Sequence, residues 1–136
     1  MVRRVKRKGS IPRALVERRG RAAAKAPNLA EVLRGTLRRR YIRCGKPTCH
    51  CQEGRGHGPF LYLCVSLGVG KVEQITIPPD EAGIARRFVR NYQRLHRVLE
   101  AISSINRQLL RQRALKDTLL AQNVANTEKD RRKKKR

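Results

Sequence analysis

The sequence predicts an α+β fold: a small three-stranded antiparallel sheet with a short N-terminal helix, a long C-terminal amphipathic helix and disordered basic tails. Two observations define the sheet. Apolar and polar residues alternate in three short segments, and a glycine turn joins the last two of them. A third observation defines the long helix, because from about residue 79 onward apolar residues recur every three or four positions. The 136 residues suffice for one compact domain plus tails.

Basic residues crowd both ends of the chain. Residues 1–25 hold ten Lys or Arg and one acidic residue, and residues 129–136 hold seven basic residues and one acidic residue. Such segments bury too little apolar surface to offset the entropy of ordering them. We therefore expect disordered basic arms over 1–27 and 123–136, with only transient helix near residues 14–16 and 22–24.

The short helix is expected next to the sheet. Asn28 followed three residues later by Glu31 resembles a capping box, and Gly35 suits the residue after a helix end. These residues predict a helix over 29–34, at the start of a sheet unit that spans 28–78.

Three strands are predicted, over 36–43, 59–67 and 72–77. The glycines of the segment 68–71 are placed where a tight hairpin requires positive φ, so the last two strands should pair through this turn. Alternation along the second strand divides its side chains between two faces: Phe60, Tyr62, Cys64 and Ser66 on one, and Leu61, Leu63, Val65 and Leu67 on the other.

One long helix is predicted over 79–122. Asp80 and Glu81 suit a helix N-terminus, where negative charge meets the macrodipole. The apolar positions follow heptad spacing, as in a coiled coil, although neighbouring apolar residues widen the stripe beyond a two-residue seam. The stripe contains Ala85, Phe88, Tyr92, Leu95, Leu99, Ile102, Asn106 and Leu109.

Between the first two strands lies a glycine-rich loop with three thiols and an imidazole. Cys44, Cys49, Cys51 and His57 follow a Cys-x₄-Cys-x-Cys-x₅-His spacing. Zn²⁺ prefers sulfur and nitrogen donors, and a Cys₃His set is one of its closed structural arrangements. We interpret residues 44–57 as a zinc knuckle with a structural ion. Removal of the zinc should then unfold the domain, since structural zinc contributes on the order of 10 kcal/mol or more to small domains.

Two alternatives to this ligand set stay open. His50 could replace His57, but cysteines on both sides of His50 already compete for the ion, which favours His57. Oxidation could pair Cys44 with Cys49 or Cys51, but reduced thiols in a cytoplasmic protein more often bind metal.

The charge balance indicates a polyanionic partner. The chain carries 34 Lys or Arg residues against 10 acidic residues, a net charge of +24. Such a surface is typical of nucleic-acid binders, DNA or RNA, that contact mainly the phosphate backbone. The candidate contact residues lie on the first strand, the knuckle and the long helix: Arg38, Arg39, Arg40, Tyr41, Arg43, Lys46, Arg55, Arg86, Arg87, Arg90, Arg94 and Arg97. Tyr41 fits two roles equally, stacking on an unpaired base or packing in the core.

Other functional classes find less support. Acidic residues are scattered singly, and a four-ligand zinc has no position for a catalytic water, so we expect no enzyme. No secretory signal or membrane span is expected, and the predicted location is cytoplasmic, with the nucleoid or a ribonucleoprotein. Three alternatives remain: a homodimer or other assembly formed through the long helix with Asn106 setting register, a structural component of a ribonucleoprotein, and a thiol-redox protein.

The knuckle also carries a resemblance to a known family. The segments Arg43-Cys-Gly-Lys-Pro-x-Cys-x-Cys51 and Gly-x-Gly-His57-Gly-Pro-Phe60 resemble an uncharacterised family of small basic proteins from bacteria, archaea and phages, described as a domain of unknown function. The resemblance covers about residues 33–110, including Arg34-Gly-Thr-Leu, the Gly70-Lys71 turn and Asn91-Tyr92. It implies that the three knuckle cysteines and His57 are shared, and it implies no activity. His50 and Cys64 depart from the family pattern.

Overall fold

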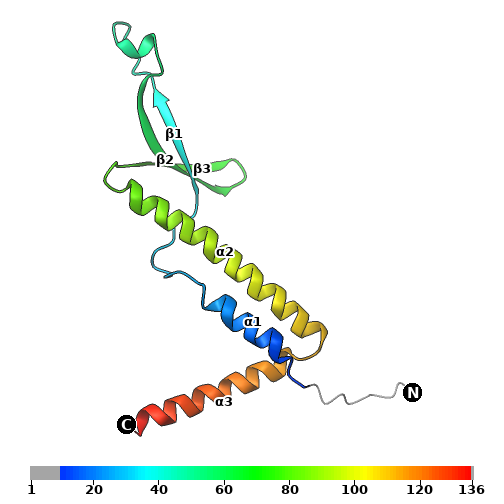
Figure 1. Ribbon diagram of the computed structural model, residues 1–136. Helices are drawn as coiled ribbons and strands as arrows, with labels where there is room; N and C mark the ends of the chain where they lie inside the picture. The colour runs from blue at the N-terminus through cyan, green and yellow to red at the C-terminus, as the bar shows by residue number, and fades with distance from the viewer. Residues whose placement is uncertain (1–9, 136) are drawn as a thin grey trace, which may run out of the picture. The chain divides into compact units, whose positions relative to one another are not determined.

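A computed structural model describes residues 10–135 of the chain (Figure 1). Its elements follow the order helix, sheet, helices. The portions of the predicted arms at 1–9 and 136 lie outside the described residues. The elements are α1 (Arg13–Ala23), β1 (Thr36–Ile42), the 3₁₀ turn η1 (His50–Gln52), β2 (His57–Gly68), β3 (Lys71–Ile77), α2 (Ala82–Arg111) and α3 (Leu115–Lys134).

The predicted sheet is confirmed. Its three strands are antiparallel and lie in the order β1-β2-β3. Leu63 of β2 lies opposite Leu37 on one side and Ile75 on the other, which fixes the register of all three strands. The hairpin turn between Gly68 and Lys71 forms where the glycines predict it. The register of β1 shifts between Arg40 and Ile42, so this strand is bulged next to the knuckle.

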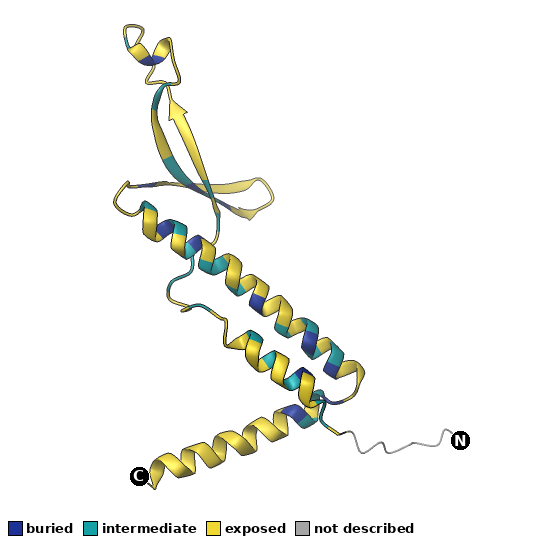
Figure 2. Ribbon diagram, in the orientation of Figure 1, coloured by how far each residue is buried: buried dark blue, intermediate teal, exposed yellow. Residues whose placement is uncertain are grey.

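The chain separates into two compact units, and each has its own apolar core. The first unit comprises Met1–Ala26 with Arg97–Arg136, and the second comprises Pro27–His96. In the second unit, one face of the sheet packs on the first turns of α2. We call it the covered face; its buried core consists of Leu63, Val65 and Ile77 from the sheet and Ala85 and Val89 from α2 (Figure 2).

The opposite face of the sheet carries the other half of the alternating side chains. Because residues directly opposite each other in antiparallel strands project to the same side, the register assigns Arg38, Tyr62 and Thr76 to one row across the sheet. We call this the open face. Its residues are Thr36, Arg38, Arg40, Phe60, Tyr62, Cys64, Ser66, Val72, Gln74 and Thr76.

The helix predicted over 29–34 is wrong. Asn28 Oδ1 accepts a hydrogen bond from the Ala30 backbone N–H (3.0 Å), which makes an Asx turn and not a helix cap. The backbone of the following segment bonds to α2 instead: Leu33 N–H donates to the Phe88 carbonyl (3.1 Å), and Asn91 Nδ2 donates to the Glu31 carbonyl (2.8 Å). These long-range bonds replace the local helical ones.

The short N-terminal helix lies at α1, within the region predicted to be a disordered arm. Leu15 is buried there together with Ile105, Leu109 and Ala114. Arg19 adds a polar link, since its Nη1 donates to Asn106 Oδ1 (3.0 Å) and, more distantly, to Thr118 Oγ1 (3.4 Å). Three helices therefore meet in the core of the first unit. The expectation of disorder is wrong for residues 13–23, and for residues 123–134, which lie in α3.

The single helix predicted over 79–122 is two helices, because α2 ends at Arg111 and α3 begins at Leu115. Nor do the buried positions of α2 form one stripe. The step from Val89, buried in the first half, to Val98, buried in the second, is nine residues, about two and a half turns. These two residues project from opposite sides of the helix. Leu99, which the heptad pattern places in the stripe, is 57% exposed.

Candidate metal centre and basic surface

The four predicted ligands converge at the tip of the β1–β2 ribbon, at the end away from α2 (Figure 1). The ligand atoms of Cys44, Cys49, Cys51 and His57 all lie within 4.8 Å of one another. Cys51 is almost fully enclosed, with 1% of its surface exposed, whereas Cys44 is exposed. Within the described residues this is the one cluster of this kind.

Two of the distances between ligand atoms are close to those around a tetrahedral ion. Zinc bonds of about 2.3 Å to sulfur and about 2.0–2.1 Å to nitrogen put neighbouring ligand atoms about 3.5–3.8 Å apart. Cys44 Sγ lies 3.5 Å from Cys51 Sγ, and Cys49 Sγ lies 3.3 Å from His57 Nε2. The donor set therefore suits a four-coordinate metal, and such a set leaves no position for water.

The local backbone explains how closely spaced cysteines share one centre. The Cys49 N–H donates to the Lys46 carbonyl (3.1 Å), and the Gln52 N–H donates to the Cys49 carbonyl (3.1 Å). These two successive turns, the second of which leads through η1, bend the chain sharply between Cys49 and Cys51. In an extended segment the side chains of residues two apart would share a face but lie farther apart along the strand.

His57 is positioned by a close approach of two strands. Its neighbour Gly56 has φ +90°, and a Cβ at this position would lie 2.8 Å from the Ile42 carbonyl oxygen. Only glycine lets β2 begin so near the end of β1. His57, opposite Ile42 in the register, is thereby held beside the cysteines.

The pKa values of Cys44 and Cys51 are shifted in opposite directions. A backbone hydrogen bond from Lys46, aided by hydrogen bonds from His57, Cys49 and Cys51, lowers the pKa of Cys44 to about 6. At neutral pH Cys44 is therefore mostly thiolate, the form that binds metals. A backbone hydrogen bond to Cys44 lowers the pKa of Cys51, but burial and the adjacent thiols outweigh it, so the net shift is upward.

His50 takes no place in the cluster. Its Nδ1 lies 3.9 Å from Cys49 Sγ, and its ring meets the His57 ring edge-on, with centroids 5.2 Å apart. His50 is exposed, whereas His57 is partly enclosed by the loop. The geometry favours the Cys₃His57 set over a set that contains His50.

The predicted basic residues of β1 and the knuckle are all exposed. Between residues 32 and 72 the chain holds eight Lys or Arg residues and a single carboxylate, Glu53. Ion pairs of the described residues involve Arg21, Arg87 and Arg107, and therefore none of the candidates on β1 or the knuckle. Those candidates are Arg38, Arg39, Arg40, Arg43, Lys46 and Arg55.

The sheet does not bring all of these side chains together. Arg38 and Arg40 belong to the open face, whereas Arg39 lies opposite Leu61 on the covered side. Tyr41 is 44% exposed, with the Arg55 guanidinium 6.0 Å from its ring centroid. Tyr41 is therefore not a core residue, and its stacking role stays a prediction.

The α2 arginines lie in three different surroundings. Arg86 and Arg90 line a groove of about 310 Å³ beside Gly35 and Leu37 of the sheet unit. Arg87 is engaged elsewhere, since it forms an ion pair with Glu31 at 3.5 Å. The other two predicted positions, Arg94 and Arg97, are exposed.

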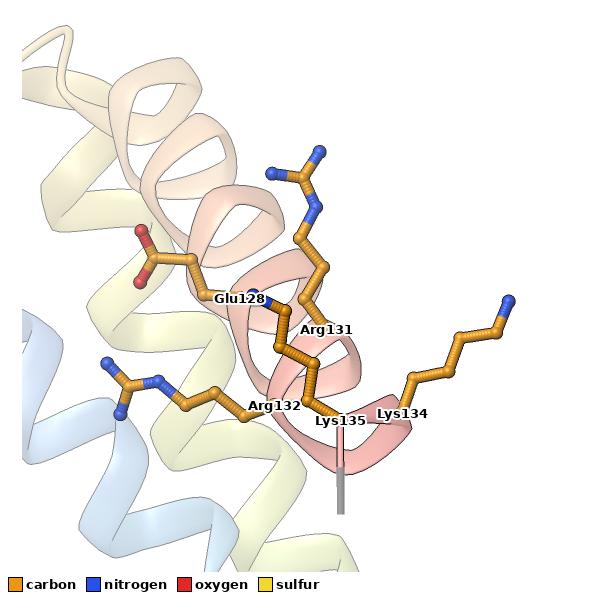
Figure 3. A pocket seen from close by; sticks show the side chains of 5 residues that line it. All are labelled: Glu128, Arg131, Arg132, Lys134 and Lys135. Atoms are coloured by element: carbon orange, nitrogen blue, oxygen red, sulfur yellow. The ribbon is translucent and has the colours of Figure 1, made fainter.

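A hollow on the described surface lies far along the chain from the cysteines. It measures about 590 Å³ and lies on the last turns of α3. Figure 3 shows its side chains extending from the helix in different directions. All of them are exposed, so the hollow is the space between solvated side chains of a basic helix end. It is lined by Glu128, Arg131, Arg132, Lys134 and Lys135.

The open face holds neighbours of Arg40 that the candidate set lacks. The Arg40 guanidinium lies over the Tyr62 ring, 5.9 Å from its centroid, and Nη1 reaches Gln74 Oε1 at 3.4 Å. Phe60 lies directly opposite Arg40 and is 40% exposed. The sequence alternation already places Phe60 and Tyr62 on one face, and this signal could have added both residues to the candidate nucleic-acid contacts.

The chain belongs to a family of small domains with no assigned activity. The family described as Domain of unknown function (DUF6788) matches residues 12–86. The match includes α1, which the sequence resemblance left out, and ends before Asn91, which that resemblance included. No curated protein and no solved structure matches this chain.

Proposed function

We propose that this protein is a zinc-stabilised nucleic-acid-binding protein that contacts mainly the phosphate backbone and has no enzymatic role. The observation that carries the proposal is the exposed, unpaired cluster of basic side chains on β1 and the knuckle, next to a closed Cys₃His centre. A rigid loop that presents fixed positive charge suits phosphate binding, since each neutralised phosphate releases condensed counterions.

The chemistry of the donor atoms supports zinc as the metal. Three thiolates and an imidazole in tetrahedral spacing suit zinc better than a hard cation, which prefers oxygen. Four protein ligands leave the ion a structural role. Reduced cysteines and a nucleic-acid partner together favour a cytoplasmic location. Over residues 10–135, no helix is both long and apolar enough to cross a membrane.

Purification without nuclease tests the proposal directly. The protein should elute with bound nucleic acid and about one zinc per chain, measured by absorbance, sequencing of the bound fraction and elemental analysis. Its affinity for labelled oligonucleotides should fall linearly on a logarithmic salt scale, with a slope of about 0.7–0.9 per phosphate contacted. Nucleic-acid-free protein whose binding ignores salt would contradict the proposal.

A pair of charge-matched variants locates the contacts in the same titration. Replacing Arg38, Arg39 and Arg40 with Gln should reduce the slope by about 2–3, the sum for three phosphates. The control replaces Lys133, Lys134 and Lys135 with Gln, which removes the same charge from α3 and should change the slope less. Equal losses would contradict the placement on the sheet.

A second candidate function is assembly through the helices of the first unit. Several apolar side chains there are more than half exposed: Leu99, Leu110, Leu119, Leu120 and Val124. A groove of about 290 Å³ runs between Leu99 and Leu115. Against it, Asn106 already accepts a hydrogen bond from Arg19, so its amide oxygen is engaged within the chain. An oligomer that persists in high salt after nuclease treatment would favour assembly. Copurification with one defined RNA would favour a ribonucleoprotein component.

A further inference from the structure

We propose that the open face of the sheet is a stacking platform for single-stranded nucleic acid, with Phe60 and Tyr62 receiving bases and Arg38 and Arg40 receiving phosphates. This inference rests on the proposed function and names the form of nucleic acid that the site takes. It starts from the register, which puts Arg38 opposite Tyr62 and Arg40 opposite Phe60.

The two aromatic side chains are two residues apart on the central strand. Side chains at i and i+2 lie on the same face, separated by about 6.5–7 Å along the strand. Successive unstacked bases can reach two rings placed in this way, as in other sheets that bind single strands. Bases inside a duplex are already stacked and offer no free π-face to such a ring.

The charge of this face complements a phosphate backbone. The ten residues of the open face include two arginines and no carboxylate. The only acidic residue of the three strands, Glu73, lies opposite Val65 and thus projects to the covered side. The rest of the face consists of small or neutral side chains, which present hydroxyl and amide groups beside the rings.

The face is also accessible. Phe60 is 40% exposed and Val72 is 70% exposed, while Arg38, Arg40 and Gln74 are exposed as well. The core residues that pack on the sheet, among them Ala85 and Val89, all contact its other side. Tyr62 is half-buried, and the Arg40 guanidinium lies over its ring.

The Arg40 guanidinium lies over the Tyr62 ring, and this cation–π contact is weaker than the stacking of a base on the same ring. An exposed cation–π contact is worth about 2- to 5-fold in an equilibrium constant. Stacking of one base on an aromatic side chain is worth about 5- to 150-fold. A base therefore displaces the guanidinium from the ring, and the freed Arg40 can bind the adjacent phosphate.

The test uses the full-length, zinc-loaded protein with single-stranded oligouridine, single-stranded oligothymidine and a duplex of equal length. The chain has no tryptophan, so Phe60→Trp places a single tryptophan on the platform, which can be excited separately from the tyrosines. Either single strand should quench its fluorescence, and the duplex should not. In the control, Val124→Trp places the fluorophore at an exposed position of α3, outside the candidate contact residues, and its fluorescence should stay unchanged.

Affinity measurements separate the two proposals. The double variant Phe60→Leu/Tyr62→Leu keeps the charge and should lose about 10-fold or more in single-strand affinity, with duplex affinity and salt slope unchanged.

If Phe60→Trp is not quenched and the double variant binds as before, the platform is wrong while salt-dependent binding still supports the proposed function. If the wild-type protein binds neither strand form, both proposals fail. If the double variant folds poorly, the fluorescence of Phe60→Trp decides between the outcomes: quenching by a single strand and not by the duplex supports the platform, and no quenching contradicts it.

Discussion

At the scale of single residues, geometry decides which of several chemically identical side chains belong to the metal centre. His50 and His57 are both close to Cys49, but only His57 belongs to the cluster of converging ligand atoms. The close approach at Gly56 fixes the start of β2, and with it the position of His57. The same comparison separates the ligand cysteines from Cys64, which lies in the middle of β2 on the open face.

These differences give a prediction with a matched control. His57→Gln should weaken zinc binding by more than about 100-fold, because even the loss of an outer-shell partner costs about 10–100-fold. His50→Gln should leave zinc affinity within a few-fold of wild type. Competition with a chromophoric chelator measures both values. Equal losses in the two variants, or a larger loss for His50→Gln, would show that the fourth ligand is assigned to the wrong histidine.

At the scale of the elements, the junction of α2 and α3 is the least expected feature. Arg113 has φ +56°, in the left-handed region, and its N–H donates to the Leu110 carbonyl (3.0 Å). The Ala114 N–H donates to the Leu109 carbonyl (2.9 Å). This pair of bonds is a Schellman motif, and the contact of Ala114 with Leu109 in the core is its usual hydrophobic partner.

A non-glycine residue at the left-handed position is strained, so its replacement should stabilise the protein. Arg113→Gly should raise the free energy of unfolding by about 1 kcal/mol, since a side chain costs about 1–2 kcal/mol in this conformation. The matched control is Gln112→Gly, one residue earlier, which should destabilise because glycine is favoured only at the left-handed site. Thermal unfolding of the zinc-loaded proteins measures both. A fall in melting temperature for Arg113→Gly would show that the Schellman turn does not form.

The strands and the ligand set could be predicted because their determinants are local. Alternation and the glycine hairpin are properties of a few adjacent residues, and the cysteine spacing is visible without the fold. The helix over 29–34 failed for the opposite reason. Asn28 and Glu31 suit either a capped helix or an Asx turn, and the distant residues Phe88 and Asn91 decide between them.

The helices show the same limit. Leu15 is one apolar residue in a basic segment. It is buried only through contacts with Ile105 and Leu109, which follow some ninety residues later in the chain. The end of α2 carries neither glycine nor proline, so the sequence offers no stop. Long-range packing, and not propensity, sets both boundaries.

At the scale of the whole molecule, metal and apolar burial stabilise different parts of the chain. The core around Leu63 and Val89 and the core around Leu15 and Leu109 are separate clusters in separate units. The knuckle contributes only Cys51 to the buried apolar residues. Its loop is therefore held by the ion and by turns, because it has almost no apolar surface to bury.

The sequence alone predicts that zinc removal unfolds the entire domain. From the structure, we expect zinc removal to unfold the knuckle and the adjoining strand ends. With excess chelator, residues 43–57 and the adjoining ends of β1 and β2 should lose hydrogen-exchange protection. Without the ion, no metal bonds hold the three cysteine sulfurs and the His57 ring within 4.8 Å of one another. The helices α1 and α3 should keep their protection, since their core contains no ligand. Exchange measured by mass spectrometry, followed by zinc re-addition to restore the pattern, provides the test. Loss of protection in α1 and α3 together with the knuckle would mean that the two units unfold as one. An unaffected knuckle would mean that the ion has no structural role, and the rigid presentation of basic side chains would then need another cause.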